Sequence, residues 1–419
     1  MRKLLLLLLG LLLQLMFINS ILGQINYSGH IQLYKMIRIL DQTEISLPFR
    51  LVEYQLGLSK GNIDLITNTA LEYRWASSEA KVDVREAYLV WYPSWGEVKL
   101  GKQIHAWGAA DGNNPTDNLN PYDYYYIFLP GSDRKIGVLS ANLKYYSNWW
   151  NFEAVVTPQH TSNRVPFDEP DFPLSQFTEF LDPRDHVVDV ENPFEFGGKW
   201  QINLKNGDLS ISGLTARDRT FSLLVYDLDQ DFSVIPYFGY RKTQVLGLDG
   251  VTFYHGITFR GEVAYFKTRN DLSGDYTQPI PLESEAVYGQ YVFQAEFAAP
   301  FDITVSSQLL GSKILKMDGA AVNQTTMMGM PFAIIANRGF LISLSRSFMD
   351  NVLEFSGYTF YNLEMNSFML DGKMDYFLDE NLAVNFGLTQ FSGNENEPED
   401  RFNDLESFSH VQVSLKYNF

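Results

Sequence analysis

Most of the chain consists of segments of about ten residues in which apolar and polar side chains alternate. In the last segment Val411, Val413 and Leu415 fall on one parity, and Gln412 and Ser414 fall on the other. Successive side chains of a β-strand point to opposite faces, so the alternation predicts strands with one apolar and one polar face. A chain made almost entirely of such segments is expected to be all-β.

The connections between the segments distinguish two all-β folds. In a soluble sandwich the apolar faces would meet inside, whereas in a membrane barrel they would face lipid. Short turns lie near residues 60, 94, 148, 206, 256, 300, 350 and 380, and they alternate mostly with longer loops such as 106–133 and 158–192. Short turns at one rim and long loops at the other are typical of an outer-membrane barrel. The sequence therefore predicts a single antiparallel transmembrane β-barrel of about 18 strands (16 to 18), wide enough for an aqueous channel.

The amino-terminal residues have the three regions of a secretory signal. Arg2 and Lys3 precede an apolar run from Leu4 to Ile18, which is followed by small and polar residues up to Gly23. This pattern predicts a signal peptide over residues 1–23 and a barrel over residues 24–419. The apolar run is shorter than the ~20 residues that a membrane-spanning helix needs.

Composition excludes several classes of function. The chain has 32 basic and 50 acidic residues, a formal charge of -18 and no cysteine. Without clustered Lys and Arg, no nucleic-acid partner is expected. Without cysteine, disulfides, thiolate metal sites and a cysteine nucleophile are impossible. We predict no metal and no cofactor, because the six histidines lack metal-ligand spacing and no glycine-rich phosphate loop follows a strand.

One stretch carries four short motifs in a fixed order. They are R-E-x-Y at residues 85–88, L-G-[KR]-Q at 100–103, W-G-x-x-D at 107–111, and N-P at 114–115 and 120–121. This order resembles a family of uncharacterised porin-like outer-membrane proteins, which is related in type to 18-stranded barrels such as the alginate-export porins. The resemblance implies a porin-like channel. However, the basic belt expected for an anionic polysaccharide is not evident in this sequence.

The polar faces of the predicted strands supply candidates for charges inside the barrel. The candidates that we expect to line the lumen are Glu72, Arg74, Glu97, Lys99, Gln103, Arg260, Glu262 and Glu296. Both signs occur, and the acidic excess of the exported chain predicts a mild preference for cations through electrostatic focusing. Lys102 interrupts the apolar parity of its own segment.

The loop from Gly108 to Arg134 is long and rich in Asn, Asp, Gly and Tyr. A long loop that folds into the lumen narrows a pore and selects solutes by size and polarity. We therefore predict a pore constriction, with the tyrosines between residues 122 and 126 packing the loop against the wall. The polar groups offered to a solute would come from Asp111, Asn113, Asn114, Asp117 and Asn120. The alternative is an external loop whose aromatic side chains cover the rim.

Two histidine motifs could indicate an enzyme. Residues 160–162 have the His-x-Ser spacing of an outer-membrane phospholipase, and residues 185–186 resemble the acid-histidine pair of outer-membrane proteases. The first motif lies at a loop edge and the second lacks an identifiable second acidic pair, so the sequence favours no enzymatic activity.

Acidic residues cluster within 168–191 and 395–406. These clusters are typical of a solvated loop surface, or they could bridge divalent cations to lipopolysaccharide.

Together these features predict passive diffusion of small hydrophilic solutes through an outer-membrane channel. Phe419 is the last residue of an alternating segment. A terminal phenylalanine in this position resembles the carboxyl-terminal signal that barrel-insertion machinery recognises. The expected partners are outer-membrane lipids and lipopolysaccharide, the insertion machinery, and the solutes. One alternative is a surface structural or polysaccharide-binding barrel without an open pore. The other is an outer-membrane barrel hydrolase.

Overall fold

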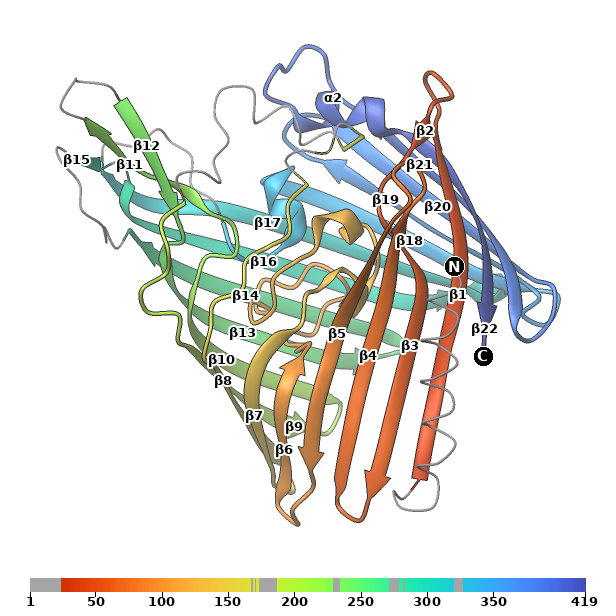
Figure 1. Cartoon of the computed structure of the whole chain (residues 1–419), viewed down its shortest axis with the longest axis horizontal. Coiled ribbons are helices and arrows are strands. Elements are labelled where there is room, and N and C mark those ends of the chain that lie inside the picture. The colour runs from red at the N-terminus through yellow and green to blue at the C-terminus, as the bar shows by residue number, and fades with distance from the viewer. Residues whose placement is uncertain are drawn as a thin grey trace.

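The computed structural model describes residues 24–166, 169, 171–172, 187–228, 234–270, 279–281, 283–319 and 327–419. Within these residues, 18 antiparallel strands pair in chain order and close into a ring when β22 pairs with β1. The register of that closing pair matches Ile31 with Tyr417 and Leu33 with Leu415. The predicted fold class and strand number are therefore confirmed (Figure 1). The predicted signal peptide lies outside the described residues.

The wall strands have the following bounds: β1 (Gln24–Arg38), β3 (Phe49–Lys60), β4 (Ile63–Arg74), β5 (Glu79–Trp91), β6 (Gly96–Gln103), β7 (Val138–Tyr146), β8 (Trp150–Thr157), β9 (Glu195–Leu204), β10 (Gly207–Arg217), β13 (Lys242–Tyr254), β14 (Ile257–Arg269), β16 (Glu283–Ala299), β17 (Ile303–Gly319), β18 (Arg338–Phe348), β19 (Leu353–Asn362), β20 (Ser367–Phe377), β21 (Leu382–Ser392) and β22 (His410–Asn418). The two-residue strand β2 (Glu44–Ile45) pairs with β1. Outside the wall, β11 (Ser222–Leu228), β12 (Val234–Gly239) and β15 (Pro279–Pro281) form a separate sheet.

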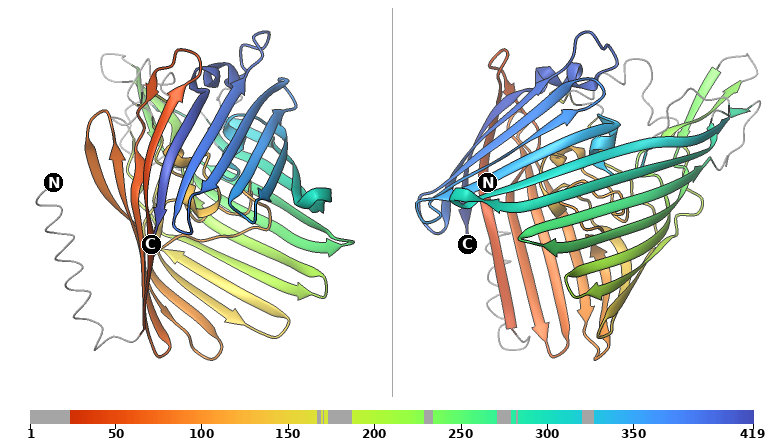
Figure 2. Two further views of the ribbon diagram at one scale, coloured as in Figure 1. Left: turned by 90° about the vertical axis from the view of Figure 1, so that its right-hand side faces the viewer. Right: turned by 180° about the vertical axis from the view of Figure 1, so that it is seen from behind.

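The two rims differ as the loop lengths predicted. At one rim the hairpins turn within a few residues, as at 61–62 between β3 and β4 and at 255–256 between β13 and β14. At the other rim, residues 104–137 join β6 to β7, and the small sheet of β11, β12 and β15 projects beyond the wall (Figure 1). Figure 2 shows from behind how the green and teal strands slant across the barrel.

The outer face of the wall is apolar. Val411, Val413, Leu415 and Tyr417 are each 40–46% exposed, whereas Ser414 on the opposite parity is buried. An aromatic chain follows the outer face near the short-turn rim, through the ring contacts of Trp91, Trp95, Tyr145, Trp150 and Trp200. A closed ring with an apolar outside and an aromatic girdle is the form in which strands can cross a bilayer, because no backbone edge is left unpaired.

Lys102 lies on the outer face, and its ammonium group reaches two acceptors on the neighbouring strand β5. The Lys102 Nζ donates to the Val84 carbonyl at 2.5 Å and lies 3.7 Å from Asp83. These partners account for a charged residue on the apolar parity.

The helices are short and lie in the connections. They are η1 (Tyr124–Tyr126), η2 (Gly131–Arg134), η5 (Pro300–Asp302), η6 (Pro331–Ile334), α2 (Arg401–Leu405) and η7 (Glu406–Phe408). Among the described residues, none of the helices has the length and apolarity needed to cross a membrane.

Loops fill the mouth of the barrel at the long-loop rim. Phe128, Phe172, Phe332, Phe402 and Phe408 come from four different loops and belong to one apolar cluster. Inward side chains of the wall, including those of β19, β20 and β21, complete this cluster. A second cluster packs Trp107 and Leu119 against inward residues of β8, β10, β13 and β14. The barrel interior at this level is therefore largely occupied by packed loops.

Candidate functional site

The loop of residues 104–137 has a fixed base where it leaves the wall. The Ile104 N–H donates to the Glu86 carboxylate at 2.9 Å, and the His105 N–H donates to Asn120 Oδ1 at 2.6 Å. The Asn120 amide nitrogen then donates to the carbonyls of Gln103 (3.0 Å) and Ile136 (2.8 Å). Asn120 thus ties the two ends of the loop together.

Glu262 of β14 holds the middle of the loop. Its Oε1 accepts hydrogen bonds from the N–H groups of Ala109 (2.6 Å) and Ala110 (2.7 Å) and from the Asn114 amide (2.8 Å). Its Oε2 accepts from the Thr116 hydroxyl at 2.7 Å and from the Thr116 N–H at 3.3 Å. Glu262 is 1% exposed, so its carboxylate is satisfied by the loop and not by bulk water.

Two glutamines extend this attachment along the far wall. Gln294 of β16 accepts from the Asp111 N–H at 2.8 Å and donates to the Asp111 carboxylate at 2.6 Å. Gln308 of β17 donates to the Asp111 carbonyl at 2.6 Å. Going round the ring from β6 through β7, β8, β9, β10 and β13, strand β14 is the sixth neighbour, so the loop crosses the lumen. Figure 1 shows it, in orange and gold, coiled inside the ring.

Buried arginines hold the returning half of the loop to the near wall. Arg85 of β5 donates to the Ser132 carbonyl at 2.9 Å and pairs with Glu53 of β3. Arg50 of β3 donates to the Asp133 carbonyl at 2.6 Å, and its guanidinium lies 4.1 Å from the centre of the Tyr126 ring. Loop carbonyls therefore supply part of the solvation that these buried cations need.

An ion-pair network joins this part of the loop to a neighbouring one. The Tyr126 hydroxyl donates to Glu72 of β4 at 3.0 Å. Arg164, in the connection after β8, lies 2.8 Å from Glu72 and 3.0 Å from Asp123. Burial raises the pKa of Asp123 to about 6 despite the nearby Arg164. Burial also lowers the pKa of His105 to about 3, and the Lys135 charge adds to this effect, so His105 is neutral at physiological pH.

The five proposed constriction residues lie on this loop but differ in whether their polar side-chain atoms are free to contact a solute. Asn114 bonds to Glu262, Asn120 ties the loop ends, and Asp117 pairs with Lys135. Asn113 is buried and donates to Gln308 at 3.4 Å. The Asp111 side chain is 62% exposed and lies 3.3 Å from Arg260. Of the five, Asp111 is exposed, Asn114 is half-buried, and Asn113, Asp117 and Asn120 are buried.

The remaining charge candidates lie on the inward parity of their strands and are paired. Glu97 lies 3.3 Å from Lys99 and 3.6 Å from Lys144. Arg260 bridges Asp111 and Glu296, at 3.3 Å from each. The other pairings are Arg74 with Glu169 and Gln103 with Ser140. Acidic and basic groups are therefore interleaved inside the barrel.

Sequence reasoning missed the arginines that secure the loop. Arg85 was part of the R-E-x-Y motif but had no assigned role, and neither Arg50 nor Arg164 was singled out. Gly108 was likewise part of a motif, and the structure explains its identity. Its φ is +92°, and a Cβ there would lie 2.5 Å from the Glu262 carboxylate. Only glycine allows the loop to approach Glu262 so closely.

Comparison with solved structures supports the architecture. The chain is similar to Pseudomonas aeruginosa OccK2 (OpdF) in complex with glucuronate, with 10% identity, a TM-score of 0.53, and coverage of 94% of this chain and 98% of that one. It is also similar to Pseudomonas aeruginosa OpdO, with 11% identity, a TM-score of 0.51, and coverage of 96% and 99%. The fold is that of an outer-membrane porin. No protein-family model matches the sequence, and no curated protein sequence matches it.

Of the two histidine motifs, only the one at residues 160–162 lies within the described residues, and its histidine is engaged by other side chains. His160 Nδ1 lies 3.2 Å from the Glu195 carboxylate, which also binds Arg219, and the His160 ring packs against Tyr240. Residues 185–186 lie outside the described residues. In the carboxyl-terminal acidic cluster, Asp400 is buried and caps α2 through the Phe402 N–H.

Proposed function

We propose that the chain is an outer-membrane channel for passive diffusion of small hydrophilic solutes, narrowed by residues 104–137. The observation that carries this proposal is the loop itself, which crosses a closed 18-stranded ring and is bonded to both walls. Supporting features are the apolar outer face, which fits a bilayer, and the polar inner face, which fits water. The motif resemblance to porin-like proteins points the same way, and the lack of a basic belt argues against an alginate-like polymer as the solute.

In this proposal Asp111, Arg260 and Glu296 form the polar group that a solute meets at the loop. Asn113, Asn114, Asp117 and Asn120 act by holding the loop in shape. Glu262 anchors the loop to the far wall. Because acidic and basic groups are mixed elsewhere in the lumen, we still expect only a mild preference for cations.

Phe419 is proposed as the insertion signal. Its N–H and C=O exchange hydrogen bonds of 3.0 Å with Gly29, so the last residue completes the pairing of β22 with β1. Its ring lies on the outer face and stacks on Tyr54 with ring centres 6.4 Å apart. Insertion machinery that delivers this strand last would close the ring, and membrane lipids would then surround the apolar face.

The alternative of a closed, polysaccharide-binding barrel has one observation in its favour. The apolar cluster of Phe128, Phe172, Phe332, Phe402 and Phe408 fills much of the mouth and leaves a cavity of only about 30 Å³ beside it.

A catalytic role has less support, because His160 is engaged by Glu195. We therefore infer a channel and not a hydrolase.

Solute flux into liposomes tests the proposal. The purified chain should let liposomes swell in glucose and in glucuronate, and flux should fall with solute size. A folded, heat-modifiable barrel that admits neither solute would instead support the closed barrel.

A further inference from the structure

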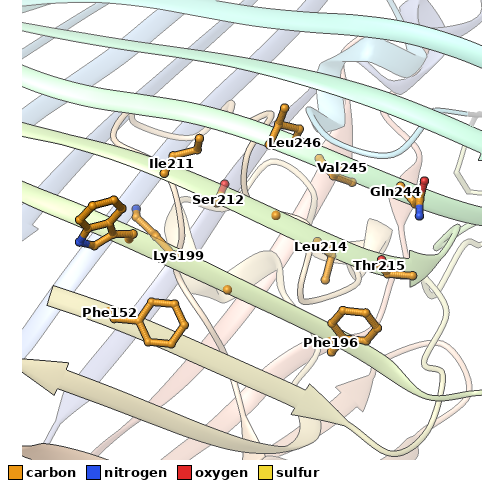
Figure 3. A pocket seen from close by; sticks show the side chains of 13 residues that line it. Phe152, Phe196, Lys199, Ile211, Ser212, Leu214, Thr215, Gln244, Val245 and Leu246 are labelled. Carbon is orange, nitrogen blue, oxygen red and sulfur yellow. The ribbon is translucent and has the colours of Figure 1, made fainter.

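The outer wall carries a largely apolar groove, and a row of basic residues lies beyond it toward the long-loop rim. On β9 and β10, Gly198 and Gly213 lie directly opposite each other, and Ala154 of β8 lies opposite Gly198. Larger side chains, including Phe152, Phe196 and Leu246, surround this level (Figure 3). The resulting groove, which we call the wall groove, has a volume of about 520 Å³.

The polarity of the wall changes in steps from the wall groove toward the long-loop rim. On the outer face of β10 and β13, Gly213 pairs with Leu246 at the level of the groove. The next pair on the same face, closer to the rim, is Thr215 with Gln244, and the pair after it is Arg217 with Lys242. Strand β10 has 11 residues. At ~3.3 Å per residue and a tilt of ~40°, it spans the ~25 Å apolar band of such barrels. Arg217, at its end, therefore lies at the level of lipid headgroups in the outer leaflet.

Three basic residues stand side by side at this level. Lys242 of β13 pairs in register with Arg217 on one side and with Arg269 of β14 on the other. Like charges directly opposite each other destabilise a sheet unless a counter-charge is present. Arg269 is bonded to Glu285 at 2.9 Å, but Lys242 has no ion-pair partner among the described residues. Elsewhere on the wall, the exposed Lys35 and Arg338 each have an acidic partner, whereas the exposed Lys313 of β17 has none among the described residues, so Lys242 is distinguished by its place between two arginines.

We propose that this face binds an anionic, multiply acylated lipid of lipopolysaccharide type, with a phosphate at Lys242 and an acyl chain in the wall groove. The inference rests on the proposed outer-membrane location. Lipopolysaccharide is favoured over other anionic lipids because the basic row lies at the long-loop rim, where the outer leaflet is found. This site uses direct cation-phosphate contacts and differs from calcium bridges at acidic loops.

The test is native mass spectrometry of the full chain in detergent, titrated with bisphosphorylated lipid A. Lys242→Gln should weaken binding by about fivefold, the effect of one surface cation on an anionic headgroup. The matched control is Lys205→Gln, an exposed lysine in the short turn between β9 and β10, which should leave binding unchanged. Equal affinity of wild type and Lys242→Gln, or an equal loss in Lys205→Gln, would overturn the phosphate site.

The groove is tested separately by Gly213→Leu. A Cβ at Gly213 would meet nothing closer than the Val245 carbonyl at 4.0 Å, so a side chain can fill the groove without displacing the backbone. Weaker lipid A binding by this variant is expected. If phosphatidylglycerol bound as tightly as lipid A, the lipopolysaccharide assignment would be overturned. If the chain formed a dimer that Gly213→Leu abolished, the groove would be occupied by a second copy of the chain and not by a lipid. Solute flux through Lys242→Gln in liposomes free of lipid A should match wild type, so lipid binding and channel function are measured independently.

Discussion

Replacing Glu262 with alanine should detach the loop from the far wall. The carboxylate accepts hydrogen bonds from Ala109, Ala110, Asn114 and Thr116. A buried donor left without an acceptor costs about 1–3 kcal/mol. Three backbone N–H groups lose their acceptor, and water entering the vacated space offsets part of the cost, so we expect the attachment to weaken by ~3 kcal/mol. That change raises the ratio of detached to attached loop by about two orders of magnitude.

Cysteine labelling measures this directly, because the chain contains no other cysteine. Asn118 is 3% exposed, so Asn118→Cys should react slowly with a membrane-impermeant maleimide and much faster once Glu262→Ala is added. Glu262→Gln keeps one acceptor oxygen and should give an intermediate rate. Glu296→Ala is the matched control, because Glu296 faces the same lumen and pairs with Arg260. Equal labelling rates in the wild-type and Glu262→Ala backgrounds would refute the anchoring role.

Three further predictions concern the wall, the loop backbone and the lumen charges. Val413→Arg should cost about 2–4 kcal/mol in a bilayer folding equilibrium, because Val413 faces lipid, whereas Ser414→Arg should be tolerated; equal costs would contradict the assigned faces. Gly108→Ala should speed labelling of Asn118→Cys, because the new Cβ would lie 2.5 Å from the Glu262 carboxylate, and an unchanged rate would count against this contact. The reversal potential in a salt gradient should show mild cation selectivity, and clear anion selectivity would contradict the charge argument.

The faces of the strands were predictable because alternation in sequence is a local property. The parity of Val411, Val413 and Leu415 placed them together on the outer face, and the structure confirms this placement. The contrast between short turns and long loops was equally local, so the strand number and the two rims followed from it. Lys102 was the exception, because its acceptors, the Val84 carbonyl and Asp83, lie on the neighbouring strand.

The partners of the loop were not predictable in the same way. Parity placed Glu262 on the inner face but said nothing about its height or about which loop would reach it. Its contact with Ala109 joins positions 153 residues apart and depends on the curvature of the five strands between β6 and β14. For the same reason, Asn114 and Asp117 were expected to face a solute, although their hydrogen bonds are made to the wall and to Lys135.

The width of the pore tests the central claim, that residues 104–137 form the constriction. The measurement is single-channel conductance in planar bilayers for the wild-type chain and for a variant lacking residues 112–120. The account predicts higher conductance and weaker discrimination among solutes in the deletion variant, with heat-resistant barrel assembly intact, because the deletion removes loop residues that cross the lumen, including Asn114 and Thr116, which bond to Glu262, and Asn113, which bonds to Gln308. An unchanged conductance in a correctly assembled deletion variant would contradict it.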